Sequence, residues 1–201
     1  DQHCRFEVHV YFYCCINIRL FRAVPAVSIR PPFPTRHRQG LRHRTSDMSR
    51  QVTASISLLE IAWPEPIGAN AYLVDDGDLT LVDAGVPLPR RSLTREIQRA
   101  GYSLPELDRV LLTHYDIDHV GGLARLGIDV PVYLGAQDLQ LLRRSWSPPW
   151  NHHKGAFHRL VRRLYSLSGL DIRPVSDGEH IGSFRAAHTP GHNPGHTVFF
   201  H

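Results

Sequence analysis

Residues 107–122 read LDRVLLTHYDIDHVGG, and this stretch constrains the fold of the chain more than any other. Its apolar centre, Val110–Leu112, predicts a strand that is buried on both faces, as strands of parallel sheets are. A polar loop follows the strand at once, and the chain then enters a helix at Val120. Sites of α/β proteins usually lie in such short loops at the carboxyl ends of strands. The stretch therefore predicts a layered α/β domain with a polar site at a sheet edge.

Strand and helix patterns alternate on both sides of this stretch. Residues 52–62 predict a strand, and residues 70–85 predict a hairpin whose two β-rich runs meet around Asp76–Gly77. Apolar spacing predicts helices at 90–102, 136–144 and 157–167, and β-rich runs predict strands at 131–135 and twice within 181–201. This order favours a sheet covered by helices.

The charge of the chain divides it into two parts. Residues 1–47 hold 8 Arg and 3 acidic residues, a net of +5, whereas residues 48–201 hold 15 Lys and Arg and 16 acidic residues, a net of −1. We therefore expect residues 48–201 to form one domain and residues 1–47 to be a disordered extension or translated upstream sequence. An Arg-rich targeting peptide is the alternative for the first part. The near-neutral second part gives no reason to expect a nucleic-acid partner.

The positions of the cysteines and the hydropathy of the sequence exclude several classes of protein. All three cysteines lie within the first 15 residues, which excludes a disulfide framework or a thiolate metal site in the body of the chain. No run reaches the about 18 apolar residues that a membrane span requires. Because no secretion signal is evident, we expect a cytoplasmic protein that acts on a small molecule without membrane contact.

The loop after the buried strand has the composition of a metal site. His114, Asp116, Asp118 and His119 fall within six positions, and imidazole nitrogens and carboxylate oxygens bind zinc at about 2.0–2.2 Å. Neighbouring side chains diverge, so two adjacent ions are the natural arrangement. His114 and Asp116 would serve one ion, and Asp118 and His119 the other. The alternative is a solvated polar loop in which Asp118 caps the following helix.

A second polar segment, HTPGHNPGH, lies near the end of the chain. Its Pro-Gly pairs predict sharp turns, because Gly191 and Gly195 can adopt positive φ values that other residues resist. His192 lies in the middle of the segment, which makes it the best candidate to reach the first loop. We expect His196 to hydrogen-bond or pack behind that site. His188 either orients a ligand or ends a strand, and we favour the strand end.

Three motifs in this order, NAYLVDDGDLTLVDAG, THYDIDHVGG and HTPGHNPGH, resemble the metallo-β-lactamase superfamily of hydrolases over roughly residues 55–200. The resemblance implies a four-layer αββα sandwich with a binuclear metal site at one edge of its two sheets. The second motif has the form H-x-D-x-D-H, with Asp116 where the family usually has histidine. Carboxylate is a harder ligand, so we expect Mn or Fe to be tolerated beside Zn.

The resemblance also assigns roles to the candidate residues. It implies a first metal bound by His114, Asp116 and His192 and a second bound by Asp118 and His119. Asp118 would also orient the attacking hydroxide, and Asp83 would support the site without binding metal. Family members continue into a bridging Asp and a last His, so the resemblance implies that the C-terminal half is incomplete at His201. We expect little activity from the chain as given.

The resemblance implies a metal-dependent hydrolase that uses a metal-activated water on a small ester, lactone or thioester. Alternatives are a nucleic-acid-processing nuclease, a di-iron redox protein on the same fold, or an inactive fragment. The segment 145–167 is expected to cover the substrate. Within it, Trp146, Trp150 and Tyr165 could line an acyl pocket, and core packing is the favoured alternative for them. His152 and His153 could contact polar substrate groups, and a solvated loop is the favoured alternative for them.

Overall fold

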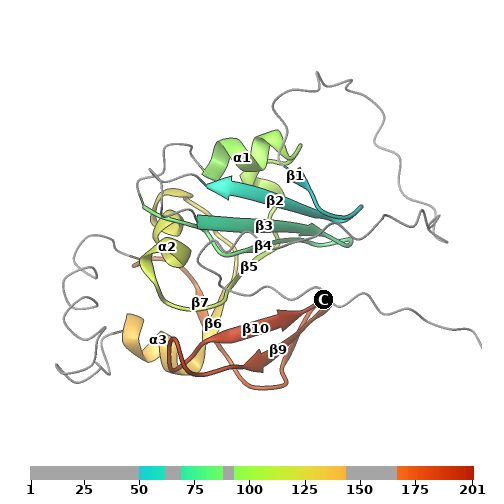
Figure 1. The fold of residues 1–201 in the computed structure, drawn as a ribbon. Coiled ribbons are helices and arrows are strands. Elements are labelled where there is room, and N and C mark those ends of the chain that lie inside the picture. Colours follow the sequence, from blue (N-terminus) through green and yellow to red (C-terminus); the bar gives the residue numbers. More distant parts are fainter. Residues whose placement is uncertain (1–49, 62–68, 88–92, 144–166) are drawn as a thin grey trace, which may run out of the picture.

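The computed structural model describes residues 50–61, 69–87, 93–143 and 167–201 (Figure 1). The expectations for residues 1–47, and for the substrate contacts between Trp146 and Tyr165, fall outside the described residues. The described ranges include all three motifs on which the predicted site depends.

The larger sheet has seven strands, which lie side by side in chain order. They are β1 (Arg50–Gln51), β2 (Ile56–Ile61), β3 (Ala69–Asp75), β4 (Leu79–Val82), β5 (Arg109–Leu112), β6 (Val132–Gly135) and β7 (Ile172–Val175). Pairs up to β3–β4 are antiparallel, and pairs from β4–β5 onward are parallel. The predicted hairpin is β3–β4, with Gly77 in its turn at a φ of 115°. The carboxyl ends of β4, β5 and β6 therefore meet at one edge.

The described helices follow the strands whose carboxyl ends form that edge. They are α1 (Leu93–Arg99), α2 (Ile117–Val120) and α3 (Ala136–Leu142), with the 3₁₀ turns η1 (Leu104–Glu106) and η2 (Gly121–Arg125). One core forms where these helices meet the larger sheet, with Ile97 from α1, Leu139 from α3 and Leu112 from β5 all buried in it. The predicted amphipathic pattern of 90–102 thus places its apolar face on the sheet.

A second, three-stranded antiparallel sheet covers the other face. Its strands are β8 (His180–Ile181), β9 (Phe184–His188) and β10 (Thr197–Phe200), in the order β10-β9-β8. Phe184 and Phe199 pack against Val82 and Leu111 in a second core between the sheets. Figure 1 shows α1 on one side of β2–β4 and the β9–β10 hairpin on the other. The described residues thus form helix, sheet and sheet layers, and the predicted α/β sandwich is confirmed.

The structure corrects the predicted start of the helix in the metal motif. The helix was expected from Val120, but α2 begins at Ile117, so Asp118 and His119 lie in its first turn. The physical reason is that the extended backbone of Asp116 (φ −75°, ψ 151°) occupies the N-cap position, where its carbonyl accepts hydrogen bonds from the His119 and Val120 amides. A regular turn therefore fixes the relative directions of two candidate ligands.

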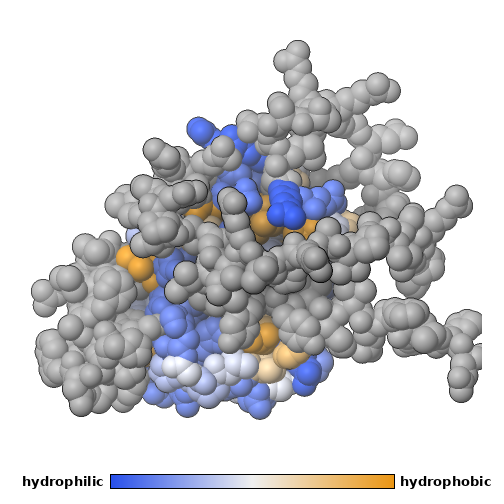
Figure 2. All heavy atoms as spheres, viewed as in Figure 1, coloured by the Kyte–Doolittle hydropathy of each residue, from blue (hydrophilic) through white to orange (hydrophobic). Residues whose placement is uncertain are grey.

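The outer surface of the described residues is largely polar. Val52 is their one exposed large hydrophobic side chain. On the face drawn in Figure 2, most of the coloured surface is hydrophilic and the hydrophobic residues appear in small separate groups. Among the described helices, none combines the length and the hydropathy that crossing a bilayer requires.

Candidate metal centre

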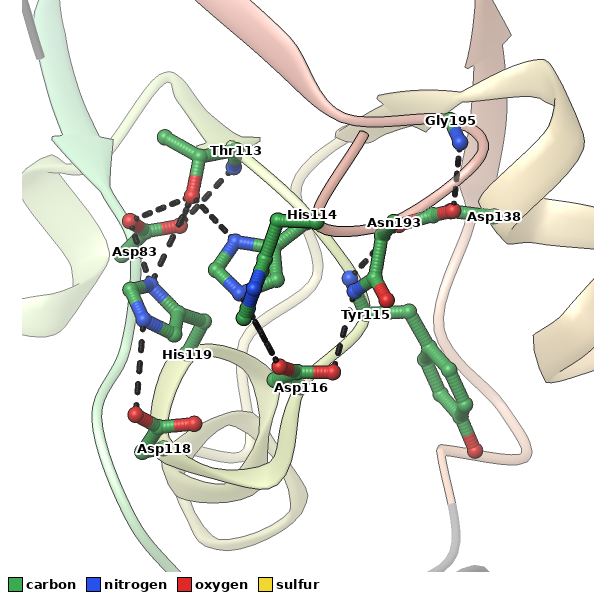
Figure 3. Close-up of polar contacts among 11 residues, drawn as sticks. Asp83, Thr113, His114, Tyr115, Asp116, Asp118, His119, Asp138, Asn193 and Gly195 are labelled. Carbon is green, nitrogen blue, oxygen red and sulfur yellow. Dashed lines mark hydrogen bonds and ion pairs between the residues drawn. The ribbon is translucent and has the colours of Figure 1, made fainter. Parts of the chain in front are cut away.

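The carboxyl end of β5 delivers the first candidate ligand to the edge where the two sheets meet. The Thr113 carbonyl accepts a hydrogen bond from the Thr197 amide of β10 at 2.8 Å, so the strands of the two sheets are tied at this point. The side chain of His114 is fully buried, with Nδ1 lying 3.0 Å from Thr113 Oγ1. Its Nε2 faces Asp116 Oδ2 at 3.4 Å. Figure 3 shows the side chains of His114 and Asp116 in the same cluster.

Three candidate ligands converge in space although they are far apart in sequence. One ligand atom from each of His114, Asp116 and His192 lies within 4.8 Å of the other two. His192 Nε2 lies 2.8 Å from Asp116 Oδ2. Ligand atoms around a tetrahedral ion with bonds of about 2.1 Å are separated by about 3.4 Å. Shifts of a few tenths of an ångström to about one ångström would therefore place the three atoms around one divalent ion.

A buried aspartate sets the orientation of a fourth candidate ligand. Asp83 Oδ2 lies 2.8 Å from His119 Nδ1, so this nitrogen donates and Nε2 keeps its lone pair. That Nε2 faces Asp118 Oδ2 at 3.6 Å. Figure 3 shows the imidazole of His119 lying between the two carboxylates. The pair Asp118 and His119 thus presents two ligand atoms at a spacing suited to a second ion.

Asp83 itself occupies an unusual backbone conformation. It is the one described non-glycine residue with positive φ, at 58°. Its carboxylate also accepts hydrogen bonds from the Thr113 amide at 2.9 Å and from Thr113 Oγ1 at 2.8 Å. Burial alone would raise the pKa of Asp83, but its close contact with the His119 imidazole lowers it. An ionised carboxylate held by a strained backbone behind a ligand marks a functional site.

His196, expected behind the site, is almost fully buried. Its Nδ1 lies 2.7 Å from Thr189 Oγ1, and its ring centroid lies 5.1 Å from that of His114. Burial lowers the pKa of His196 to about 4, so the ring is neutral at pH 7. His188 ends β9, and its Nε2 lies 3.1 Å from the Val175 carbonyl oxygen.

Two residues that the sequence analysis did not single out connect the two motif loops. Asp138 of α3 accepts a hydrogen bond from the Tyr115 amide at 2.9 Å and another from the Gly195 amide at 2.7 Å. Burial raises the pKa of Asp138. Asn193 donates from Nδ2 to Asp116 Oδ1 at 2.9 Å. The sequence signal for Asp138 is an acidic residue beside the apolar Leu139 in the first turn of a predicted helix.

The structure also corrects the expected role of the glycines in the second motif. Neither Gly191 nor Gly195 has a positive φ. Gly195 is instead required for close packing, because a Cβ at this position would lie 2.3 Å from the Asp138 backbone nitrogen. No heavy atom outside its immediate neighbours lies within 4 Å of a Cβ built at Gly191. The chain turns here without left-handed backbone, and contact with α3 selects glycine at one of the two positions.

Comparison with known proteins adds relatives from bacteria and fungi. YobT of Bacillus subtilis (strain 168), an uncharacterized protein, is 31% identical over 146 residues, which cover 68% of this chain and 58% of YobT. The probable metallo-hydrolase YflN of the same strain is 26% identical, with coverages of 66% and 56%. The atrochrysone carboxyl ACP thioesterase of Aspergillus fumigatus is 32% identical over 138 residues, with coverages of 66% and 26%. The chain spans about half the length of such curated relatives.

Solved structures and the family profile also point to the metallo-β-lactamase fold. The metallo-β-lactamase SMB-1, in a complex with mercaptoacetic acid, superposes with a TM-score of 0.61 at 22% identity, covering 76% of this chain and 57% of SMB-1. At this identity the likeness concerns the fold. The profile described as the metallo-beta-lactamase superfamily matches residues 64–200, which include all three motifs. Because this match covers more than half of the sequence, the chain belongs to the metallo-β-lactamase superfamily.

Proposed function

We propose that the protein is a metal-dependent hydrolase of a small ester, lactone or thioester. The observation that carries the proposal is the convergence of His114, Asp116 and His192, whose ligand atoms lie within 4.8 Å of one another. Two imidazoles and one carboxylate form a donor set that zinc accepts, and the carboxylate also suits Mn or Fe. A divalent ion held there would lower the pKa of a water molecule and polarise the bond under attack.

The chain's own side chains would position the reactants and transfer protons. The Asp118 side chain is 36% exposed beside the buried ligands, so it is placed to orient an attacking water and to accept its proton. Asp83 holds the His119 ring in one orientation through Nδ1. The neutral ring of His196 fills the space behind His114 without adding positive charge. We propose the second ligand pair, Asp118 and His119, as the place of a second ion.

Two observations support a small carbonyl substrate. One relative is named an atrochrysone carboxyl ACP thioesterase, and it is 32% identical to this chain over 138 residues. Residues 48–201 hold 15 basic and 16 acidic residues, so the domain lacks the positive charge that nucleic-acid binding requires. Within the carbonyl class we favour a thioester. The cytoplasmic location and the identity of the metal stay predictions.

The first prediction concerns metal dependence. We expect the chain, stripped with a chelator and reloaded with Zn²⁺, Mn²⁺ or Fe²⁺, to show a low, metal-dependent activity that is higher for a thioester than for an aryl ester or a lactone. The substitution His114→Ala should lower kcat/KM by more than about 100-fold. Loss of a residue that only supports a metal ligand lowers activity by up to about 100-fold. The measurement is initial rate against metal concentration for each substrate.

The matched control is His180→Ala, because His180 is an exposed histidine on β8 and the change should leave kcat/KM unaltered. A β-lactam and a phosphodiester complete the panel of substrates. Metal-dependent cleavage of the phosphodiester alone would replace the proposal with a nuclease-like activity. No metal-dependent turnover of any carbonyl substrate would reject the proposed class.

A further inference from the structure

We propose that Asn193 is a positioning residue that holds Asp116 as a ligand through a single oxygen. This inference rests on the metal centre of the proposed function and deepens it. A carboxylate at position 116 has two chemically equivalent oxygens, and rotation about its terminal bond is only weakly restricted. A defined metal ligand therefore needs an anchor for one of the two oxygens.

The contacts of Asp116 divide its oxygens between two tasks. Oδ1 accepts a hydrogen bond from Asn193 Nδ2 at 2.9 Å. Oδ2 lies 2.8 Å from His192 Nε2 and 3.4 Å from His114 Nε2, so it faces the ligand cluster. In Figure 3 Asp116 lies between His114 and Asn193, with one oxygen directed toward each. The Asn193 amide thus hydrogen-bonds to Oδ1, and Oδ2 would be the oxygen that binds a metal ion.

Two further observations indicate that this contact is specific. Asp116 occupies the N-cap position of α2, yet its side chain makes no capping hydrogen bond. It therefore lacks the hydrogen bond to a backbone amide of the first helical turn that an N-cap aspartate usually accepts. Asn193 is only 2% exposed, so its hydrogen bond to a carboxylate is shielded from water. A buried residue that is distant in the sequence thus bonds Oδ1 of Asp116, and the side chain makes no capping bond to α2.

The position of Asn193 in the chain couples the anchor to the ligand next to it. Its carbonyl oxygen accepts the backbone amides of Gly191 and His196, each at 3.3 Å, which closes the turn. The same turn carries His192, so one segment supplies both a ligand and the group that orients another ligand. We infer that the amide at 193 matches the carboxylate at 116, because Asn193 Nδ2 donates to an acceptor oxygen, whereas a metal-bound histidine would present an N–H donor there.

The test uses Co²⁺, whose visible absorption reports coordination geometry, with the chain freed of metal beforehand. We expect Asn193→Ala and the similarly branched Asn193→Leu to bind Co²⁺ about 10- to 100-fold more weakly than wild type. The absorption band should change as the freed Oδ1 begins to compete for the ion. Asn70→Ala, at an exposed position on β3, is the matched control and should change neither quantity.

A double-mutant cycle separates positioning from general support of the loop. In an Asp116→His background there is no carboxylate to orient, so Asn193→Ala should alter Co²⁺ affinity by less than about threefold. Circular dichroism of the metal-free variants checks that they are folded. Equal losses from Asn193→Ala in both backgrounds would overturn the role of Asn193 and leave the metal centre intact. A wild-type chain that takes up no Co²⁺ would overturn the metal centre as well.

Discussion

At the scale of single residues, Asp83 shows how a residue can support the candidate metal centre by orienting one of its ligands. Its carboxylate accepts a hydrogen bond from His119 Nδ1–H and two from Thr113. A partner that accepts at Nδ1 fixes the imidazole tautomer, so the lone pair stays on Nε2. The positive φ of Asp83 is the conformational cost of this arrangement.

We predict that Asp83→Asn leaves the backbone nearly unchanged and mixes the tautomers of His119. Asparagine tolerates positive φ, but its amide group places a donor against either Thr113 or His119. Nitrogen-15 spectra of the metal-free imidazoles measure the tautomers, with Nδ1–H expected for His119 in wild type. His188, whose Nε2 lies near the Val175 carbonyl, is the internal control. An unchanged His119 tautomer in the variant would contradict the role assigned to Asp83.

At the scale of elements, α3 holds together two loops that are far apart in the chain. Asp138 accepts the Tyr115 amide from the first loop and the Gly195 amide from the second. Both loops carry candidate ligands, so their relative position depends on this contact. The second loop lies so close to α3 that glycine is needed at 195, because a Cβ there would lie 2.3 Å from the Asp138 backbone nitrogen.

We predict opposite outcomes for two glycine substitutions in the same segment. Gly195→Ala should destabilise the fold by about 1–3 kcal/mol, because the new methyl group forces α3 and the loop apart. It should also weaken Co²⁺ binding. Gly191→Ala adds a methyl group to exposed space at a negative φ and should change stability by less than about 1 kcal/mol. Thermal unfolding compares the pair, and equal shifts would argue against the packing explanation.

At the scale of the whole molecule, the two sheets are tied together at the edge opposite the metal centre. Asp76, in the β3–β4 turn, accepts a hydrogen bond from Ser183 in the β8–β9 turn. The same oxygen lies 2.9 Å from His201 Nε2, just after β10. Partial burial would raise the pKa of Asp76, but the hydrogen bonds from Ser183 and His201 and the charge of His201 lower it below 3.8.

The sign of this shift gives a pH prediction. A carboxyl group whose pKa is lower in the folded state contributes stability above its unfolded pKa and loses it as the pH falls through the folded value. Asp76→Asn should therefore be less stable than wild type by about 1 kcal/mol near neutral pH, and the difference should shrink below pH of about 4. Thermal unfolding from pH 7 to 3 measures it. Asp129→Asn, at an exposed position, is the control, and a constant difference across this range would contradict the prediction.

The sequence by itself determined the features that depend on near neighbours. The apolar run Val110–Leu112 and the turn at Asp76–Gly77 predicted a buried strand and a hairpin, because each signal lies within a few consecutive residues. The spacing from His114 to His119 placed four candidate ligands of two types together, since six residues cannot separate widely. Motif order then indicated the family, which the profile match confirms.

Only the tertiary structure decided how distant segments meet. It brought His192 to Asp116 across 76 positions, placed Asn193 on the same carboxylate, and put Asp138 between the two loops. It also showed that Gly195 serves packing instead of a left-handed turn. The physical reason is that these contacts depend on which strand edges adjoin and how closely layers pack. Local periodicity does not report which strand edges adjoin or how closely the layers pack, because it extends over only a few residues.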